Sequence, residues 1–157
     1  MDREILFRGK RMDNGEWVDG YYFEREERSF IMTDTYPIDE EYNCTPIRII
    51  AVEVIPETVG QYTGLKDKNG KKIFEGDIAK YNTIAANERI VYGIVKYRST
   101  YEQYRSHNPC GYIIDWQKNN STGRTLREDL PFWCDSMSNM EIVGNIHDNP
   151  ELLEASE

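Results

Sequence analysis

The sequence predicts a mainly β protein with little helix, and three observations support this prediction. Apolar residues occur in short, alternating runs that are typical of half-buried strands. Asn-Gly pairs at 14–15 and 69–70 favour tight turns. Glycine and proline together make 17 residues, 11 and 6, which supply turns between short strands. We therefore expect an N-terminal antiparallel hairpin or sheet over residues 1–57, packed with a strongly curved, SH3-like β-barrel over residues 58–157 that ends in a short helix.

The N-terminal region contains four predicted strands. The first begins at Ile5–Phe7, and the turn at Asn14-Gly15 leads into the second, over Glu16–Phe23. Phe30–Met32 is a short third strand, and Ile47–Ile55 is a longer fourth strand that stops before Pro56. The acidic segment 34–43 lacks the oxygen spacing of a calcium loop, so we expect a solvated loop there.

The C-terminal region shows further strands at regular intervals. They are predicted at Ile78–Tyr81, Arg89–Arg98, Gly111–Trp116, Pro131–Cys134 and Met140–Ile146. Gly93 lies inside one of them, where a glycine usually indicates a bulge or a sharp bend. Strands of this spacing favour a small barrel over residues 65–147, with the joint to the N-terminal region at residues 56–64.

Helix is predicted only in short pieces. At the tail, Asn149 can cap a helix whose first position is Pro150. A second helix is predicted over residues 100–106, where Tyr101 and Tyr104 are three residues apart.

Charge and hydropathy exclude several classes of protein. The formal net charge of -9 disfavours a nonspecific polyanion binder, because the overall field repels phosphate. No run approaches the roughly 20 apolar residues that cross a bilayer, and the N-terminus is too charged for a signal peptide. We therefore expect a cytoplasmic protein that does not bind membranes.

The sequence contains no pattern that indicates catalysis, a cofactor or a metal site. Three cysteines and two histidines lack the spacing of zinc ligands, and His107 with Cys110 is typical of a turn. No phosphate-loop motif accompanies the glycines between residues 60 and 76. One alternative stays open, an enzyme that acts on nucleotides or nucleic acid with a divalent ion held by carboxylates, and its candidate ligands are Asp77, Asp115 and Asp135.

The one segment with binding chemistry is basic and rich in tyrosine. Residues 61–105 carry 9 basic and 5 acidic side chains. Cations and rings together are the components of a surface on which nucleic-acid bases stack. The tentative nucleic-acid face consists of Lys72, Lys80, Tyr81, Lys96, Tyr97 and Arg98. The competing interpretation is that these tyrosines are ordinary strand residues packed across strands.

Three stretches of the chain resemble the YopX family of phage and prophage proteins. They are residues 3–11 with 15–18 and 20–21, residues 59–78, and residues 141–153. The resemblance implies a β-rich, homo-oligomeric protein from a phage or prophage of a low-GC Gram-positive bacterium or a gut anaerobe, expressed in the host cytoplasm. It supplies no catalytic residues and no cofactor.

Two functions follow as hypotheses. The first is a non-enzymatic accessory protein that self-associates through strand edges or an apolar face and engages a host or phage protein. The alternative is a small nucleic-acid-binding module that uses the basic, tyrosine-rich face over residues 62–105.

Overall fold

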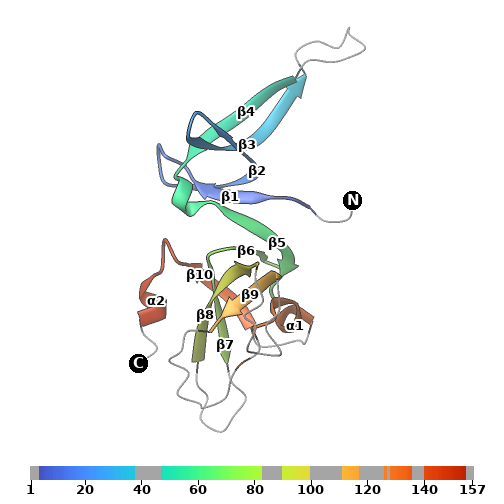
Figure 1. Ribbon diagram of the computed structural model, residues 1–157, viewed down its shortest axis with the longest axis vertical. Helices are drawn as coiled ribbons and strands as arrows, with labels where there is room; N and C mark the ends of the chain where they lie inside the picture. The colour runs from blue at the N-terminus through green and yellow to red at the C-terminus, as the bar shows by residue number, and fades with distance from the viewer. Residues whose placement is uncertain are drawn as a thin grey trace. The chain divides into compact units, whose positions relative to one another are not determined.

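Two antiparallel sheets and two short helices make up the computed structural model (Figure 1). The structure describes residues 4–37, 47–82, 90–99, 111–116, 126, 128–135 and 140–154. The chain divides into two compact units, unit 1 over Met1–Tyr62 and unit 2 over Thr63–Glu157. The sequence placed the division between residues 57 and 58. The prediction of a mainly β protein with little helix is confirmed.

Unit 1 is an antiparallel sheet with the strand order β4-β3-β2-β1-β5. Its strands are β1 (Phe7–Lys10), β2 (Trp17–Arg25), β3 (Arg28–Pro37), β4 (Ile47–Val54) and the first part of β5 (Gly60–Lys66). A 3-10 turn over Pro56–Thr58 separates β4 from β5. The predicted hairpin between β1 and β2 is confirmed, with Lys10 opposite Trp17 and Gly15 at a φ of 71°.

The sheet of unit 1 curls, so that the end of β4 returns to the loop after β1. The backbone N–H of Met12 donates to the Glu53 carbonyl at 3.0 Å, and the N–H of Ile55 donates to the Lys10 carbonyl at 2.8 Å. Ile31 and Val54 are fully buried inside the curl. Gly20 leaves room there, because a Cβ at this position would lie 2.0 Å from the Met32 carbonyl oxygen.

Unit 2 contains a four-stranded antiparallel sheet with the order β10-β7-β8-β9. Its strands are β7 (Asp77–Asn82), β8 (Ile90–Arg98), β9 (Gly111–Asp115) and β10 (Met140–Asn145). The second part of β5 and β6 (Lys72–Phe74) form a hairpin beside it. The predicted strands of this region are confirmed in all but one case.

The exception is the segment around Pro131, which was predicted as a strand and forms the helix α1 (Leu130–Asp135). Proline is tolerated in the first turn of a helix, where its missing N–H has no partner to lose. Leu130 and Trp133, three residues apart, fall on one side and are both buried in the core. The short tail helix α2 (Glu151–Glu154) is confirmed, whereas the helix predicted over residues 100–106 lies outside the described residues.

The predicted closed, SH3-like barrel is not confirmed, because the described strands of unit 2 form an open sheet. Closure would require β9 to pair with another strand of the sheet along its free edge. That edge is taken by the segment before α1, since the Ile114 N–H donates to the Glu128 carbonyl at 2.8 Å and Ile113 bridges Asp129.

Of the two features predicted at Gly93, a bulge or a sharp bend, the bulge is absent. Ala79 lies opposite Gly93 in an unbroken register between β7 and β8. The glycine is needed for space instead, because a Cβ there would lie 2.6 Å from Ile114 Cγ2 and 2.7 Å from Trp116 Cε3. The irregularities of register fall elsewhere, between Met32 and Asp34 in β3 and between Ile142 and Gly144 in β10.

The core of unit 2 lies between one face of this sheet and α1. Its buried residues are Ile73, Ala79, Val91, Val95, Ile114, Trp116, Leu130, Trp133, Met140 and Ile142. No helix among the described residues is long and apolar enough to cross a membrane.

The turn between β2 and β3 has two consecutive glutamates with positive φ angles. Glu26 and Glu27 have φ angles of 52° and 62°, which disfavour residues with a Cβ. We expect the double variant Glu26→Asn/Glu27→Gly to stabilise the protein by about 1–2 kcal/mol, because Asn-Gly prefers this geometry. Thermal unfolding measures the change.

A matched control removes the same two charges without changing the turn preference. The variant Glu26→Gln/Glu27→Gln should leave the stability within about 0.5 kcal/mol of the parent, because both side chains are on the surface. Equal stabilisation in the two variants would mean that charge, and not backbone conformation, is the cause.

Candidate functional site

The six residues of the predicted nucleic-acid face do not share one face of the sheet. Successive side chains of a strand point to opposite faces, so Lys80 and Tyr81 diverge, as do Lys96 and Tyr97. Val91 and Val95 of β8 are buried, so they point to the core face of the sheet. Tyr97 points to that face too, because it is two residues after Val95. The face with Lys96 and Arg98 is the opposite one.

The cations Lys80, Lys96 and Arg98 are bound to carboxylates. Lys80 Nζ lies 3.5 Å from Glu141 Oε1, and Lys96 Nζ lies 2.7 Å from Asp115 Oδ2. Arg98 Nη1 lies 2.6 Å from Glu128 Oε2. A phosphate would have to compete with these carboxylates. Lys72 lies on β6, half-buried.

The two tyrosines have different surroundings. Tyr81 is half-buried against the core, with its ring edge-on to Trp133 at a centroid distance of 4.6 Å. Tyr97 is 58% exposed and packs edge-on against Tyr112 at 5.3 Å. Tyr81 therefore packs as a core residue does. The nucleic-acid hypothesis for the segment as a whole stays a prediction.

Two of the three candidate ligands of the alternative metal hypothesis, Asp77 and Asp115, have described side chains, and each carboxylate binds another group of the protein. Asp77 is 1% exposed and accepts the backbone N–H of Phe74 at 2.8 Å, and Asp115 holds Lys96. The side chain of Asp135 lies outside the described residues, as do His107 and Cys110. Among the residues that are described, no group of three or more His, Cys, Asp or Glu side chains could hold a metal ion.

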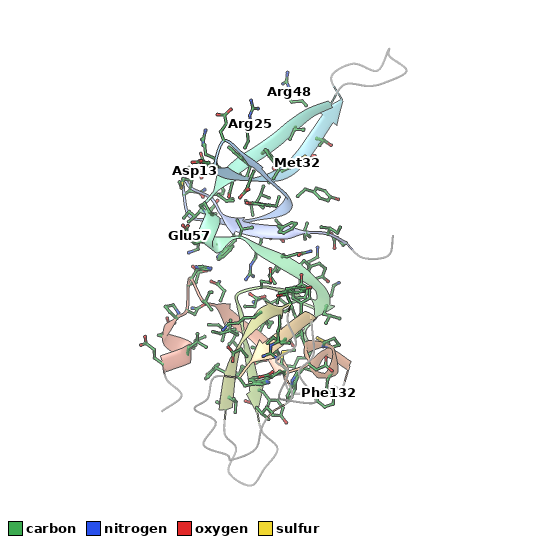
Figure 2. The ribbon with its side chains drawn as sticks, in the orientation of Figure 1. Asp13, Arg25, Met32, Arg48, Glu57 and Phe132 are labelled. Carbon is green, nitrogen blue, oxygen red and sulfur yellow. The ribbon has the colours of Figure 1, made fainter. Side chains whose placement is uncertain are left out.

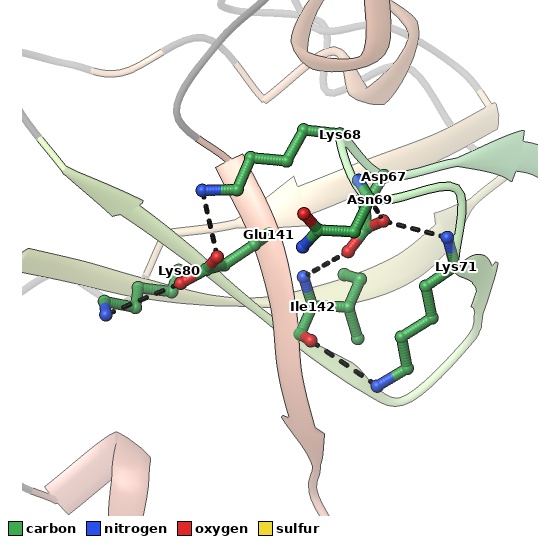
Figure 3. Close-up of polar contacts among 7 residues, drawn as sticks. All are labelled: Asp67, Lys68, Asn69, Lys71, Lys80, Glu141 and Ile142. Carbon is green, nitrogen blue, oxygen red and sulfur yellow. Dashed lines mark hydrogen bonds and ion pairs between the residues drawn. The ribbon is translucent and has the colours of Figure 1, made fainter.

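The glycine-rich stretch forms a turn organised by one buried carboxylate, that of Asp67 (Figure 3). Asp67 is 6% exposed. Its Oδ1 accepts the backbone N–H groups of Asn69 and Lys71, both at 2.9 Å, and its Oδ2 accepts the N–H of Ile142 at 3.0 Å. Because Ile142 belongs to β10, this carboxylate joins the β5–β6 turn to the sheet of unit 2.

Charged side chains reinforce the same junction. Lys68 Nζ lies 2.9 Å from Glu141 Oε2, and Lys80 approaches the other oxygen of that carboxylate (Figure 3). The hydrogen bond from Lys68, with the field of both ammonium groups, holds the pKa of Glu141 below its usual range. Lys80 is therefore part of a structural network.

A second polar side chain ends β10. Asn145 Oδ1 accepts the backbone N–H groups of His147 and Asp148 at 2.9 and 3.0 Å. The turn role predicted for His147 is thus present in the structure. Within residues 59–78 and 141–153, Asp67, Asp77 and Asn145 accept backbone N–H groups at turns.

Four apolar side chains, two of them exposed and two half-buried, lie together on one sheet face of unit 1, and sequence reasoning missed them. Two cross-strand pairs, Tyr21 opposite Met32 and Phe23 opposite Phe30, lie on the outer face of β2 and β3. Tyr21 is 58% and Phe23 38% exposed. The Phe23 and Phe30 rings stack at 5.3 Å with an interplanar angle of 13°. We call these four residues the apolar patch; Figure 2 labels Met32 among them.

A sequence signal for the apolar patch did exist. Residues 17–23 are apolar or aromatic at both odd and even positions, with Trp17, Tyr21 and Phe23 on one face and Val18, Gly20 and Tyr22 on the other. A strand with one solvated face would alternate with polar residues. The pattern therefore indicated that both faces of β2 carry apolar side chains.

The structure is that of a β protein of two compact units, with turns held by buried aspartate and asparagine side chains. The chain belongs to the YopX family, since the family model described as YopX protein matches residues 6–154. It is similar to protein EF1440 from Enterococcus faecalis, whose crystal structure gives a TM-score of 0.61 at 23% identity over 96% of this chain and 99% of that chain. That likeness shows the fold. No curated protein matches the chain.

Asp67 gives the sharpest test of the structural reading of this region. We expect Asp67→Ala to destabilise the protein by about 2–4 kcal/mol, because three backbone N–H groups lose a charged acceptor inside the fold. Chemical denaturation measures the free energy of unfolding.

The control is Asp13→Ala, which removes an exposed carboxylate held by Arg11. It should cost less than about 1 kcal/mol, as exposed ion pairs do. A loss of stability no larger for Asp67→Ala than for Asp13→Ala would contradict the role assigned to Asp67.

Proposed function

We propose that this protein is a non-enzymatic accessory protein of a phage or prophage, which acts in the host cytoplasm by self-association and by binding a host or phage protein. The apolar patch of unit 1 carries the proposal. Family membership is consistent with it but assigns no activity.

The distribution of exposed apolar side chains supports binding through unit 1. Of the nine large hydrophobic side chains that are exposed among the described residues, six belong to this smaller unit. They are Ile5, Met12, Tyr21, Phe23, Ile49 and Ile50. Of these six, Tyr21 and Phe23 lie on the same face of β2, and exposed apolar residues that lie together are typical of sites that bind proteins.

The construction of the apolar patch also fits a binding surface. Its rings are held in place across two paired strands, so little side-chain entropy remains to be lost when a partner covers them. Arg28 lies over the Phe30 ring at 5.3 Å and forms an ion pair with Glu53, which places a polar group at the border of the patch. An apolar centre with a polar rim is the usual anatomy of a protein interface.

Two double variants test the proposal, because unit 2 offers a matched control. Tyr21 and Tyr97 are both 58% exposed, and Phe23 and Phe132 are 38% and 37% exposed. We expect Tyr21→Ser/Phe23→Ser to capture at least about tenfold less partner protein than the wild type from host cells that express the phage genes. The reason is that aromatic anchors dominate interfaces. Tyr97→Ser/Phe132→Ser should retain the captured protein.

Quantitative affinity capture with the full chain, followed by mass spectrometry, gives the readout, and circular dichroism checks that each variant is folded. Equal loss of partner in both double variants would remove the apolar patch from the proposal. A wild-type chain that is strictly monomeric at micromolar concentration and captures no protein would overturn the proposed function as a whole.

A further inference from the structure

The sheet of unit 1 has an outer face that extends beyond the apolar patch. Ile31 and Val54 are buried inside the curl, and a Cβ at Gly9 would lie 3.0 Å from Val54 Cβ, so these three residues mark the inner face. Side chains alternate between the two faces along a strand, and opposed residues of paired strands share a face. The charged side chains that β1–β4 place on the outer face are those of Arg8, Lys10, Asp19, Arg25, Arg28 and Glu53.

The outer face is positively charged, although unit 1 is acidic. Residues 1–62 carry 7 basic and 14 acidic side chains. Four of those basic and two of those acidic side chains lie on the outer face, which gives it a formal charge of +2, that is 4 minus 2. Because opposite charges attract across an interface, this face favours a partner that carries carboxylates.

The cations of the outer face form two groups at opposite ends of β2. Arg8 Cζ lies 4.8 Å and Lys10 Nζ lies 5.6 Å from the centroid of the Trp17 ring, at the start of the strand. Arg25, labelled in Figure 2, lies opposite Arg28 at the other end. Trp17 and Arg25 are eight residues apart, which is about 26 Å along an extended strand. The tyrosine and phenylalanine that β2 contributes to the apolar patch lie between the two groups.

The carboxylates beside Arg25 and Arg28 leave both cations able to bind another acceptor. Among the described residues, Arg28 donates its Nε–H and one Nη2 N–H to Glu53 alone, which leaves three of its five donors. Arg25 lies 3.5 Å from Glu26, but the two side chains are 77% and 78% exposed, and ion pairs of this kind are weak. A carboxylate of a partner can therefore approach either guanidinium.

We propose that the partner protein of unit 1 presents an apolar centre with carboxylates on both sides of it. The apolar centre covers the apolar patch, and the carboxylates meet Arg8 with Lys10 at one end of the outer face and Arg25 with Arg28 at the other. This inference rests on the protein binding in the proposed function and specifies the chemistry of the partner.

A protein fits this arrangement better than a single-stranded nucleic acid does. Nucleic-acid grooves carry cations along the whole backbone, because every nucleotide has a phosphate. Between Trp17 and Arg25, β2 contributes no cation and one carboxylate, that of Asp19. Base stacking also needs open ring faces, whereas Phe23 and Phe30 stack on each other and two cations lie over Trp17.

Titration calorimetry tests the proposal with a defined protein, one that the wild-type chain captures and Tyr21→Ser/Phe23→Ser does not. Lys10→Glu/Arg25→Glu reverses one cation at each end of the outer face. We expect it to raise the dissociation constant at least about tenfold, because two attractions become repulsions. For the wild type, raising NaCl from about 50 to about 500 mM should also raise the dissociation constant, since salt screens exposed charges.

The matched control is Arg48→Glu/Lys66→Glu, which changes the net charge by the same amount. Both side chains are exposed. Arg48, labelled in Figure 2, alternates with the outer-face residues of β4, and Lys66 belongs to unit 2. The control should bind within about twofold of the wild type. Equal losses in the two double variants would overturn the proposal, because the net charge and not its position would then be the cause.

A second variant guards against a change of fold, because Lys10 lies over the Trp17 ring. Arg25→Glu alone alters a side chain that is 77% exposed, and it should raise the dissociation constant at least about threefold. Circular dichroism verifies that all variants are folded.

The remaining outcomes separate this inference from the proposed function. Wild-type affinity in both charge-reversed variants would overturn the acidic partner and leave the apolar patch as a binding surface. If no captured protein depends on Tyr21 and Phe23, the inference and the role of the apolar patch fail together. Anisotropy of a labelled oligo(dT) of about 20 nucleotides is the last arm. Binding of this probe that Lys10→Glu/Arg25→Glu loses would overturn the proposal and assign the outer face to nucleic acid.

Discussion

The alternation of a β-strand is the constraint on which the rest of this structure depends. Side chains alternate between two faces, and backbone N–H and carbonyl groups alternate between two edges. In unit 1 this rule buries Ile31 inside the curl and leaves Phe30 and Met32 on the outer face with the apolar patch. In β4 the same rule separates residues that bond to β3 from residues that face outward.

Alternation also decides how much could be predicted from the sequence. Strand existence followed from short apolar runs, and both Asn-Gly turns were found because glycine accepts a positive φ. The nucleic-acid face combined Lys80 with Tyr81 and Lys96 with Tyr97, yet neighbours in a strand cannot share a face. The ion pair of Lys96 with Asp115 could not be predicted, because it depends on which strand lies next to β8.

Other features were hidden for different physical reasons. The four residues 131–134 are compatible with either a strand or a first helical turn. They form a helix, which buries Trp133 in the core. The turn at Glu26 and Glu27 has no sequence signal, since neither residue favours a positive φ. In unit 2, residues 128–129 lie along the edge of β9, through the bond of Ile114 with Glu128 and the bridge of Ile113 with Asp129, and the sequence pattern does not indicate this pairing.

Unit 2 and unit 1 use polar groups differently. In unit 2, backbone N–H groups donate hydrogen bonds to the side-chain oxygens of Asp67, Asp77 and Asn145, and these bonds stabilise turns. In unit 1, alternate residues of β4 direct their backbone groups away from β3, as the Glu53 carbonyl does toward the N–H of Met12. Amide hydrogen exchange measured residue by residue tests this account most directly. In the monomer, the N–H groups of Ile49 and Ala51 should exchange fast, while those of Ile50 and Val52 are protected by their bonds to β3. Equal exchange rates at all four residues in the monomer would contradict it.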